Sequence, residues 1–475
     1  MKQFVSKTKI VATLGPSSSS KNIIKKMIDE GIDVFRINFS HSKKEDFLTL
    51  TNIIKELNIE LNTHVAILAD LQGPKLRVGE IENKHIDLIS GDIITFVSEK
   101  CIGTKTKIYM SYREFAEDVT VGEFILIDDG KIKLQVIETN KKDTVVAKVI
   151  FGGKLSSHKG VNLPNTKVSL PCLTDEDISN AIFAIKQDVD WIALSFVRKA
   201  SDVLELKELI KANKGHVGVI SKIEKPEALV EIDQIIEYSD GIMVARGDLG
   251  VEMPFDEVPL IQKKIIEKCI DQSKPVIVAT QMMESMITNF TPTRAEANDV
   301  ANAVLDGADA LMLSGETSIG KFPVETIINM QKIINYTENN GNPFNKKSLP
   351  KEGTSTFLAD SICYNASSLA KEVKAKAIIT FTNSGYTAFR ISSHRPEADI
   401  YAFTDNKRIL QFMSLVWGVR TFYLNTFEHL ENAIQESIDI LKKNNLLFKD
   451  DRVIHVGNSP LNEHGKTNII KVSKV

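Results

Sequence analysis

Apolar runs alternate with segments of helical periodicity over most of the chain. The first run, Thr8 to Leu14, is followed by Lys21 to Glu30, where apolar residues recur with helical spacing. The pattern repeats, and the later strand-like runs are Val34 to Phe39, Val65 to Asp70, Trp191 to Phe196, Val217 to Ile223, Gly241 to Ala245, Val276 to Thr280 and Ala310 to Ser314. Nearly continuous apolar runs are typical of parallel strands covered on both faces. Eight such strand and helix units predict an α/β fold of the TIM (β/α)8 barrel type.

A segment of different character interrupts this pattern between its third and fourth units. From Lys75 to Pro171 the apolar residues form short alternating runs, separated by turn signals such as Ser90-Gly91 and Asp129-Gly130. This spacing predicts a small inserted β-barrel domain. Because the insert occupies a loop at the carboxyl end of a barrel strand, we expect it to act as a lid that excludes water.

The end of the chain has its own strand and helix signals. Residues 341–353, rich in Asn, Gly, Pro and Lys, predict a linker. Beyond it, runs such as Ala377 to Phe381 and Val453 to Val456 predict a separate C-terminal α/β domain. The expected domains are residues 1–74 with 172–340 for the barrel, 75–171 for the insert and 354–475 for the C-terminal domain.

Composition and charge exclude several classes of protein. With 59 Lys and Arg against 62 Asp and Glu, the chain of 475 residues has no overall attraction for nucleic acid or a membrane surface. No apolar run is long enough to span a bilayer, and the N-terminus lacks the apolar core of a signal peptide. We therefore expect a cytoplasmic protein that binds neither nucleic acid nor membranes.

Polar residues follow most of the predicted barrel strands, at the edge where TIM barrels carry their active sites. Lys222 and Glu224 end one run two positions apart, so their side chains point to the same side. The other residues at strand ends are Arg36, Asn38, Ser40, Asp70, Lys75, Arg77, Arg246, Gly247, Asp248, Thr280, Gln281, Ser314 and Glu316. A salt-bridged or capped strand end is the alternative for any single residue, but sheet packing does not require charge at nearly every strand end. Cations that bind phosphate, beside carboxylates that suit Mg2+ or Mn2+, predict a phosphorylated substrate and a divalent metal.

Long motifs along nearly the whole chain resemble pyruvate kinase. They include Arg36-Ile-Asn38-Phe-Ser40-His41, Lys159-Gly-Val-Asn-Leu-Pro164, Ile220-Ser-Lys222-Ile-Glu224, Met243-Val-Ala-Arg246-Gly247-Asp248, Ala279-Thr280-Gln281-Met-Met-Glu and Leu313-Ser314-Gly-Glu-Thr. The resemblance implies transfer of the phosphoryl group of phosphoenolpyruvate to ADP, giving pyruvate and ATP in the last step of glycolysis. It also implies a homotetramer.

The family's pattern assigns roles to the charged residues at the predicted barrel mouth. It implies that Glu224 and Asp248 ligate Mg2+ or Mn2+, which also takes oxygens of the substrate. Arg36 would hold the transferring phosphoryl group, and Lys222 would neutralise its charge in the transition state. These roles agree with the chemistry, because phosphoryl transfer depends on positioning and charge stabilisation.

The resemblance extends to the substrate carboxylate, the enolate and the nucleotide. The backbone around Arg246 and Gly247, with the hydroxyl of Thr280, would receive the carboxylate. Thr280, with Ser314 and bound water, is the candidate relay for protonating the enolate, although a hydroxyl is a poor lone acid. Residues expected to contact the nucleotide are Arg77, Lys159, Asn38 and His41.

One departure from the family pattern concerns K+. Many relatives have Asp-Thr-Lys-Gly-Pro-Glu after the third strand and hold K+ with the equivalents of Asn38, Ser40 and Asp70. Here the segment runs Asp70-Leu71-Gln72-Gly73-Pro74-Lys75, and its Leu, Gln and Lys mark K+-independent members of the family. The ammonium of Lys75 can supply the charge that K+ otherwise brings, so we expect that K+ is not required.

A second departure concerns regulation in the C-terminal domain. Thr382, Asn383, Ser384, Gly385 and Thr387 form a turn between a strand and a helix, where backbone N–H groups can hold an effector phosphate or simply cap the helix. In relatives activated by fructose 1,6-bisphosphate a later Gly-rich loop carries Trp and Arg. The corresponding segment 457–465 has neither, so another sugar phosphate, a nucleotide or no effector is equally open.

Two other functions compete with pyruvate kinase. A different metal-dependent enzyme of phosphoenolpyruvate or pyruvate, such as a lyase, explains Glu224 and Asp248 but not the inserted lid or Lys159. A non-catalytic regulatory relative would be favoured by the loss of Lys222, Glu224 or Asp248, and the chain retains all of them.

Overall fold

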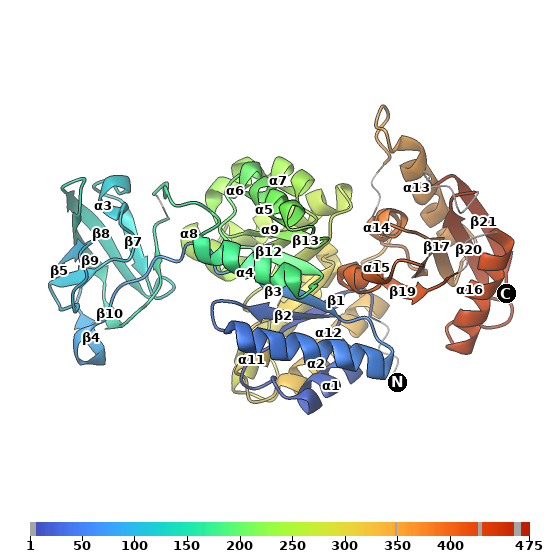
Figure 1. Cartoon of the computed structure of the whole chain (residues 1–475), viewed down its shortest axis with the longest axis horizontal. Helices are drawn as coiled ribbons and strands as arrows, with labels where there is room; N and C mark the ends of the chain where they lie inside the picture. Colours follow the sequence, from blue (N-terminus) through green and yellow to red (C-terminus); the bar gives the residue numbers. More distant parts are fainter. Residues whose placement is uncertain (1–5, 165, 347–348, 426–429, 460–466) are drawn as a thin grey trace.

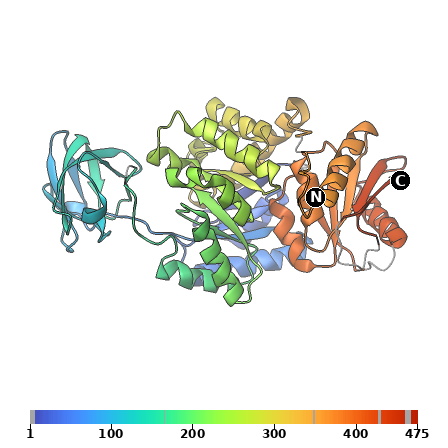
Figure 2. The ribbon, with the colours of Figure 1, turned by 90° about the horizontal axis from the view of Figure 1, so that it is seen from above.

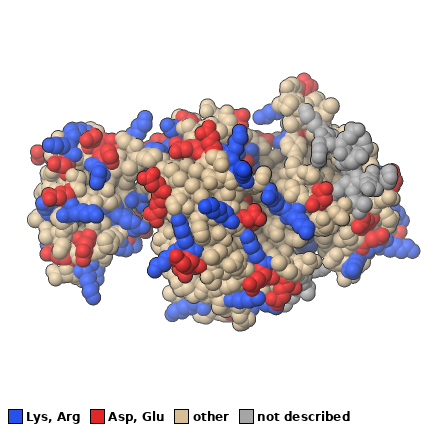
Figure 3. All heavy atoms as spheres, in the orientation of Figure 1, with Lys and Arg blue, Asp and Glu red and all other residues tan. Residues whose placement is uncertain are grey.

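The computed structural model describes residues 6–164, 166–346, 349–425, 430–459 and 467–475. Three bodies lie in a row, with the barrel in the middle, the insert at one end and the C-terminal domain at the other (Figure 1). A view from above shows the same order, with the insert joined to the barrel by extended connections (Figure 2). Lys and Arg side chains are interspersed with Asp and Glu on the face drawn in Figure 3.

The central body is a closed barrel of parallel strands in the order β1-β16-β15-β14-β13-β12-β3-β2. The strands are β1 (Lys9–Thr13), β2 (Val34–Asn38), β3 (Ala66–Asp70), β12 (Trp191–Leu194), β13 (Gly218–Ile223), β14 (Gly241–Ala245), β15 (Val276–Ala279) and β16 (Ala310–Leu313). Almost every strand residue is buried, as expected when helices cover the outside and side chains fill the inside. The predicted TIM barrel is confirmed.

Helices follow the strands around the barrel. They are α1 (Lys21–Asp29), α2 (Lys44–Leu61), α4 (Asp175–Lys186), α5 (Ala200–Ala212), α6 (Pro226–Val230), α7 (Ile232–Tyr238), α8 (Arg246–Glu252), α9 (Val258–Asp271), α10 (Arg294–Asp306), α11 (Gly315–Ser318) and α12 (Pro323–Gly341), with a short 3-10 helix, η2 (Glu284–Ile287). The apolar periodicity of Leu229 to Ile236 predicts helix, but the structure divides this stretch into two separate helices, α6 and α7, which meet at Glu231. The carboxylate of Glu231 accepts the N–H of Ala200 at the start of α5, which holds the break against a neighbouring helix.

Four aspartates repeat at the amino end of the barrel, which we call the base. Each one directly precedes an even-numbered strand of the barrel, and its carboxylate accepts a backbone N–H from the strand before it. The pairs are Asp33 with Ile10 at 2.9 Å, Asp190 with Ile67 at 2.8 Å, Asp240 with Val219 at 2.9 Å and Asp309 with Val276 at 3.1 Å. These bonds join the strands at the base in successive pairs.

The insert is built from β-strands, as predicted. Its larger sheet has the order β11-β7-β8-β9-β5-β6, and a smaller one pairs β10 with β4. The strands are β4 (His85–Leu88), β5 (Ile93–Val97), β6 (Lys107–Tyr109), β7 (Phe124–Ile127), β8 (Ile132–Thr139), β9 (Thr144–Phe151), β10 (Gly153–Ser156) and β11 (Val161–Asn162), with the short helices η1 (Glu82–Lys84) and α3 (Phe115–Asp118). Alternate residues of β8 and β9 are buried in a core separate from that of the barrel.

Two side chains of the barrel hold the connections to the insert. The carboxylate of Asp177, in the first turn of α4, accepts the N–H groups of Gln72 at 3.0 Å and Gly73 at 3.1 Å on the outgoing connection. The guanidinium of Arg198 donates to the carbonyl of Val168 at 2.6 Å on the returning one. The connections are therefore anchored to the barrel before the insert begins.

The C-terminal domain packs against the base of the barrel. Its sheet has the order β19-β18-β17-β20-β21, where the strands are β17 (Ala377–Phe381), β18 (Asp399–Thr404), β19 (Val419–Tyr423), β20 (Arg452–Gly457) and β21 (Ile469–Lys474). Its helices are α13 (Phe357–Glu372), α14 (Tyr386–Ser393), α15 (Lys407–Phe412), η3 (Met413–Leu415) and α16 (Leu430–Lys443). Phe412 stacks on Trp191 of the barrel with 4.1 Å between the ring centroids, and the guanidinium of Arg395 lies 2.8 Å from the carboxylate of Asp309. Within the described ranges, no helix has the length and apolar character needed to cross a membrane.

Candidate active site

A cavity of about 840 Å3 opens at the carboxyl ends of the barrel strands, which we call the mouth. Most of the residues predicted from strand ends line it together: Arg36, Asn38, Ser40, His41, Asp70, Leu71, Lys75, Lys222, Glu224, Asp248 and Ser314. They come from β2, β3, β13, β14 and β16 and from the loops that follow these strands. The barrel topology thus gathers residues from positions 36 to 314 into one space.

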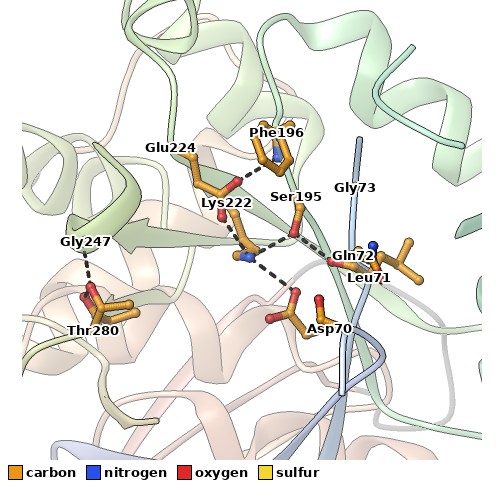
Figure 4. A network of polar contacts seen from close by, with 12 residues as sticks. Asp70, Leu71, Gln72, Gly73, Ser195, Phe196, Lys222, Glu224, Gly247 and Thr280 are labelled. Carbon is orange, nitrogen blue, oxygen red and sulfur yellow. Dashed lines mark hydrogen bonds and ion pairs between the residues drawn. The ribbon is translucent and has the colours of Figure 1, made fainter. Parts of the chain in front are cut away.

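The ammonium of Lys222 lies at the centre of a polar network (Figure 4). Its Nζ atom is 2.7 Å from Glu224 Oε1, 2.8 Å from Ser195 Oγ and 3.4 Å from Asp70 Oδ1. Burial alone would lower the pKa of Lys222, but the carboxylates of Asp70, Glu224 and Asp248 outweigh burial and raise that pKa. The side chain is therefore a fixed positive charge over the physiological pH range.

Asp70 also fixes a second cation, Arg36, beside Lys222. The Nε of Arg36 donates to Asp70 Oδ2 at 2.8 Å, its Nη2 binds the same oxygen, and its Nη1 donates to Thr13 Oγ1 at 2.9 Å. Burial would raise the pKa of Asp70, but the charges of Lys222 and Arg36 overcome burial and lower it. Asp70 therefore stays ionised and orients both cations toward the cavity.

Glu224 and Asp248 are the candidate metal ligands. Glu224 is buried and accepts the N–H of Phe196 through Oε2 at 2.9 Å, whereas Asp248 is exposed to the cavity in the first turn of α8. Burial raises the pKa of Glu224, the charge of Lys222 opposes this rise, and the negative charge of Asp248 adds to it. A divalent cation held by both carboxylates would offset this repulsion at Glu224.

Two carboxylates fit a Mg2+ or Mn2+ ion that takes its other ligands from water and substrate, rather than a metal held by protein ligands alone. No group of three His, Cys, Asp or Glu residues with metal-site geometry occurs in the part of the chain that the structure describes. Mg2+ commonly uses only one or two protein carboxylates and completes its shell with water and substrate oxygens. Glu224 and Asp248 offer that arrangement beside the cations of the mouth.

Lys75 reaches the cation cluster from the segment after β3. Its ammonium donates to Ser40 Oγ at 3.1 Å, and Asn38 shapes that turn by accepting the N–H of Ser40 at 2.9 Å. Withdrawal from bulk water and the nearby charge of Lys222 lower the pKa of Lys75, while Asp70 partly offsets them. The lysine thus lies beside the residues that the sequence predicted as a monovalent-cation site or its substitute.

Thr280 has an unusual backbone conformation after β15. Its φ of 68° is rare for a β-branched residue, and such conformations cost about 1–3 kcal/mol. The Oγ1 atom accepts the N–H of Gly247 at 2.7 Å and donates to the carbonyl of Ala279 at 2.6 Å. The hydroxyl is therefore held against the start of α8, at the residue that directly precedes Asp248.

The side chain of Arg246 points away from the mouth cavity. Its guanidinium pairs with Asp299 at 2.8 Å, donates to the carbonyl of Thr280 at 2.7 Å and lines an adjacent hollow of about 580 Å3. Arg246 therefore supports the backbone of Thr280 from outside the cavity. The guanidinium of Arg246 is therefore not among the cations of the mouth cavity, and contact of the substrate carboxylate with the backbone around Arg246 and Gly247 stays a prediction.

The residues expected to bind nucleotide lie in two places. His41 lines the mouth cavity, where burial and the charge of Lys75 lower its pKa. Arg77 and Lys159 lie on the insert and outside the cavity lining: Arg77 donates to the carbonyl of His158 at 2.9 Å, and Lys159 pairs with Asp128 at 2.8 Å. The structure thus does not bring these two cations to the mouth.

The candidate effector loop lies in the C-terminal domain, on the opposite side of the barrel from the insert (Figure 1). Thr382 accepts the N–H of Gly385 at 2.9 Å, Thr387 contacts the hydroxyl of Thr467 at 2.8 Å, and the amide of Asn383 lies 3.4 Å from Asp405. Ser384 lies at the tip of the turn, just before α14. Of the later segment 457–465, residues 460–465 lie outside the described residues.

Sequence reasoning missed Ser195 and Phe196, which follow β12. Ser195 binds Lys222 through its hydroxyl, and Phe196, with a φ of 57°, binds Glu224 through its backbone N–H. The available signal was weak: one hydroxyl residue near the end of the apolar run Trp191 to Phe196. A neutral hydroxyl at a strand end is a weaker signal than the charged residues at the other strand ends.

The closed parallel barrel, with two buried cations and two carboxylates around one mouth cavity, defines a TIM-barrel enzyme that acts on a phosphorylated substrate. The sequence matches the family descriptions "Pyruvate kinase, barrel domain" over residues 5–327 and "Pyruvate kinase, alpha/beta domain" over residues 360–473. The chain belongs to the pyruvate kinase family.

Individual relatives support this assignment over nearly the full length. The chain is 42% identical over 468 residues to the pyruvate kinase of Geobacillus stearothermophilus, covering 98% of this chain and 80% of the relative. It is 40% identical to that of Clostridium acetobutylicum, covering 99% of both chains. A crystal structure of a pyruvate kinase from Cryptosporidium parvum superposes with a TM-score of 0.92 at 35% identity, covering 100% of this chain and 97% of that one.

The family match settles the choice among the three functions considered from sequence. The activity is that of pyruvate kinase, EC 2.7.1.40, a glycolytic phosphotransferase. Its substrates are phosphoenolpyruvate and ADP, and the family generally uses a divalent metal. The lyase and the non-catalytic relative are set aside.

Proposed function

We propose that the mouth cavity performs phosphoryl transfer with Arg36 and Lys222 as the cations that bind and neutralise the transferring group. The observation that carries this proposal is the convergence of both cations on Asp70, with Lys222 Nζ 2.7 Å from Glu224. Positively charged donors held in place before the reaction stabilise a phosphoryl transition state without reorganisation. Asp70 keeps them in place and remains ionised while doing so.

Glu224 and Asp248 would hold the divalent cation, Mg2+ or Mn2+. When bound, the metal neutralises negative charge and orients oxygens of the substrate. The buried position of Glu224 limits its motion, and the exposed position of Asp248 leaves room for substrate oxygens beside it. The backbone around Arg246 and Gly247 and the hydroxyl of Thr280 would receive the substrate carboxylate. The N–H of Gly247, which donates to Thr280 Oγ1 at 2.7 Å, would have to turn to the carboxylate for this contact.

The enolate that remains after transfer needs a proton at carbon. Thr280 supplies a hydroxyl held at a strained backbone position, which fixes its direction. The Oγ of Ser314 is buried and has no hydrogen-bond partner among the described residues, so it is free to join a relay through water. We assign the two hydroxyls to this relay, with the proton drawn from solvent.

Lys75 supplies the positive charge that K+ brings in many relatives. Its ammonium lies on Ser40, within the group formed by Asn38, Ser40, Asp70 and the Leu71 segment. A tethered cation needs no recruitment from solution. The test is Lys75→Glu, which restores the carboxylate of K+-dependent relatives: we expect its turnover to be low without K+ and to rise at least about tenfold when K+ is added, a difference of about 1.4 kcal/mol. Equal rates of Lys75→Glu with and without K+ would contradict the assignment.

The nucleotide would bind between the barrel and the insert. His41 and Asn38 lie at the mouth, whereas Arg77 and Lys159 lie on the insert, so nucleotide contact by all four requires the insert to approach the mouth. The ion pair of Lys159 with Asp128 would have to open for this contact. A rise in the KM for ADP in Lys159→Ala, with the KM for phosphoenolpyruvate unchanged, would support this arrangement.

Three further proposals concern the whole molecule. We infer a cytoplasmic homotetramer, which sedimentation of the purified protein would test. The domain division at residues 74–75, 171–172 and 341–353 agrees with the separate cores of the three bodies and is testable by limited proteolysis. The loop of Thr382, Asn383, Ser384, Gly385 and Thr387 is proposed as an effector phosphate site, and its test is the effect of sugar phosphates and nucleotides on the KM for phosphoenolpyruvate.

A further inference from the structure

Ser195 connects two segments of the mouth through one buried hydroxyl. The residue lies directly after β12 and is 2% exposed. Its Oγ donates to the carbonyl of Leu71 at 2.7 Å and accepts from the ammonium of Lys222 at 2.8 Å (Figure 4). A hydroxyl has one proton, so donation to Leu71 leaves its lone pairs directed at Lys222. The polarity of the link is therefore fixed.

Three groups surround the ammonium of Lys222: Glu224 and Ser195 lie within 2.8 Å, and Asp70 forms a longer ion pair at 3.4 Å. Glu224 and Asp70 carry negative charge, and Ser195 is the neutral partner among them. A neutral acceptor directs an N–H group without competing for the positive charge. Without it, the ammonium would be pulled only between the two carboxylates, and its position would follow theirs.

Phe196, the residue after Ser195, holds Glu224, which is the ion-pair partner of Lys222. Phe196 donates its backbone N–H to Glu224 Oε2 at 2.9 Å, and its φ of 57° is rare for an aromatic residue. Consecutive residues of one loop thus contact Lys222 and Glu224 through different atoms. The loop sets the ammonium and the carboxylate at defined places in the mouth.

We propose that Ser195 is a positioning residue for phosphoryl transfer, whose hydroxyl, anchored on the Leu71 carbonyl, aims the ammonium of Lys222 at the transferring group. The proposal rests on the role assigned above to Lys222. Electrostatic stabilisation depends on donors being held where charge develops, so a misdirected ammonium slows the chemical step more than it weakens substrate binding.

The chain offers a matched control in Ser221. This serine is fully buried, precedes Lys222 on β13, and its hydroxyl contacts Ser239 at 2.6 Å rather than the ammonium. We expect Ser195→Ala to lower kcat about tenfold with a change in the KM for phosphoenolpyruvate below about threefold. Ser221→Ala should keep kcat within about twofold of the unmodified enzyme. Ser195→Cys, which preserves volume but replaces the hydroxyl by a poor acceptor, should show the same loss of kcat and serves if Ser195→Ala does not fold.

A double-mutant cycle separates positioning from general support of the fold. In Lys222→Met there is no ammonium to aim, so adding Ser195→Ala should lower the residual rate by less than about twofold. An equal tenfold loss in both backgrounds, or a kcat of Ser195→Ala as high as that of Ser221→Ala, would overturn the inference. The role of Lys222 is judged separately: a normal rate in Lys222→Met would refute that role, whereas a slow Lys222→Met beside a normal Ser195→Ala would refute only the role of Ser195.

Discussion

The two ends of the barrel both carry carboxylates next to strands, but these carboxylates are placed differently. At the base, Asp33, Asp190, Asp240 and Asp309 each accept a backbone N–H of the preceding strand. At the mouth, Asp70 and Glu224 bind cationic side chains that face a cavity. Three of the base aspartates also pair with a cation: Asp33 with Lys9, Asp240 with Lys207 and Asp309 with Arg395. What separates the two ends is therefore the strand-to-strand bond that each base aspartate makes and the open cavity that the cations of the mouth face.

The same contrast is visible in their protonation. Burial raises the pKa of Asp190 at the base to about 7. Asp70 at the mouth is buried too, but the charges of Lys222 and Arg36 overcome burial and lower its pKa. Asp70 thus stays charged between two cations, whereas Asp190, which accepts the backbone N–H of Ile67, approaches neutrality.

Among substitutions that test this difference between the two ends, we expect the largest effect at the mouth, where Glu224→Gln should lower the activity. The amide keeps the size of the side chain but removes a metal ligand and the charge opposite Lys222. We expect kcat/KM to fall by at least about 10³-fold, since charge stabilisation is the main contribution to this reaction. Pyruvate formation and thermal unfolding of the same sample provide the measurements. A fall in melting temperature that accounts for the lost activity would show that Glu224 is structural.

The next largest effect is expected at the base, where Asp309→Asn should lower the stability of the fold. This change leaves the buried guanidinium of Arg395, 2.8 Å away, without its charged partner. Removing one member of a buried pair typically costs about 3–5 kcal/mol of stability, and kcat of the folded enzyme should stay within about twofold. Denaturant unfolding is the measurement. Asp240→Asn is the control, because its partner Lys207 is 33% exposed and such pairs contribute about 1 kcal/mol or less.

A smaller effect, with a distinct pH dependence, is expected from Asp190→Asn. The folded-state pKa of about 7 is above the value of about 3.9 for an unfolded aspartate, so the folded chain binds more protons between these pH values. Asp190 therefore stabilises less as pH rises through this window, and its full cost is present above pH of about 7. Asn cannot ionise, so the variant should gain roughly 2–4 kcal/mol over the unmodified protein at pH 8 and little at pH 4. Parallel stability curves over this range would contradict this prediction.

Much of the mouth was predictable because position alone identifies it. In a TIM barrel every strand end reaches the same edge, so Arg36, Asp70, Lys222 and Glu224 could be assigned to one site before their distances were known. Their charge made them visible in otherwise apolar runs. The barrel itself followed from the same runs.

Other features depend on tertiary contacts that the sequence does not encode locally. Ser195 was missed because a neutral hydroxyl near the end of an apolar run has many structural explanations. The direction of the Arg246 side chain follows from Asp299 on another helix, 53 residues away in sequence. The break at Glu231 depends on a contact with Ala200, which helical periodicity cannot indicate.

The base aspartates were also invisible from sequence. An aspartate before a strand resembles an ordinary turn residue. Only the strand pairing shows that Asp33, Asp190, Asp240 and Asp309 each reach back to the preceding strand. Their regular spacing around the barrel is a property of the closed sheet.

With Lys75 beside Ser40, the mouth should need no monovalent cation from solution. The most direct test is the rate of pyruvate formation from phosphoenolpyruvate and ADP with Mg2+, in buffer whose only monovalent cation is a large organic ion, followed by titration with K+. We expect full turnover before K+ is added and no more than about a twofold change afterwards. Turnover that is absent until K+ is added, and restored by K+, would contradict the role given to Lys75.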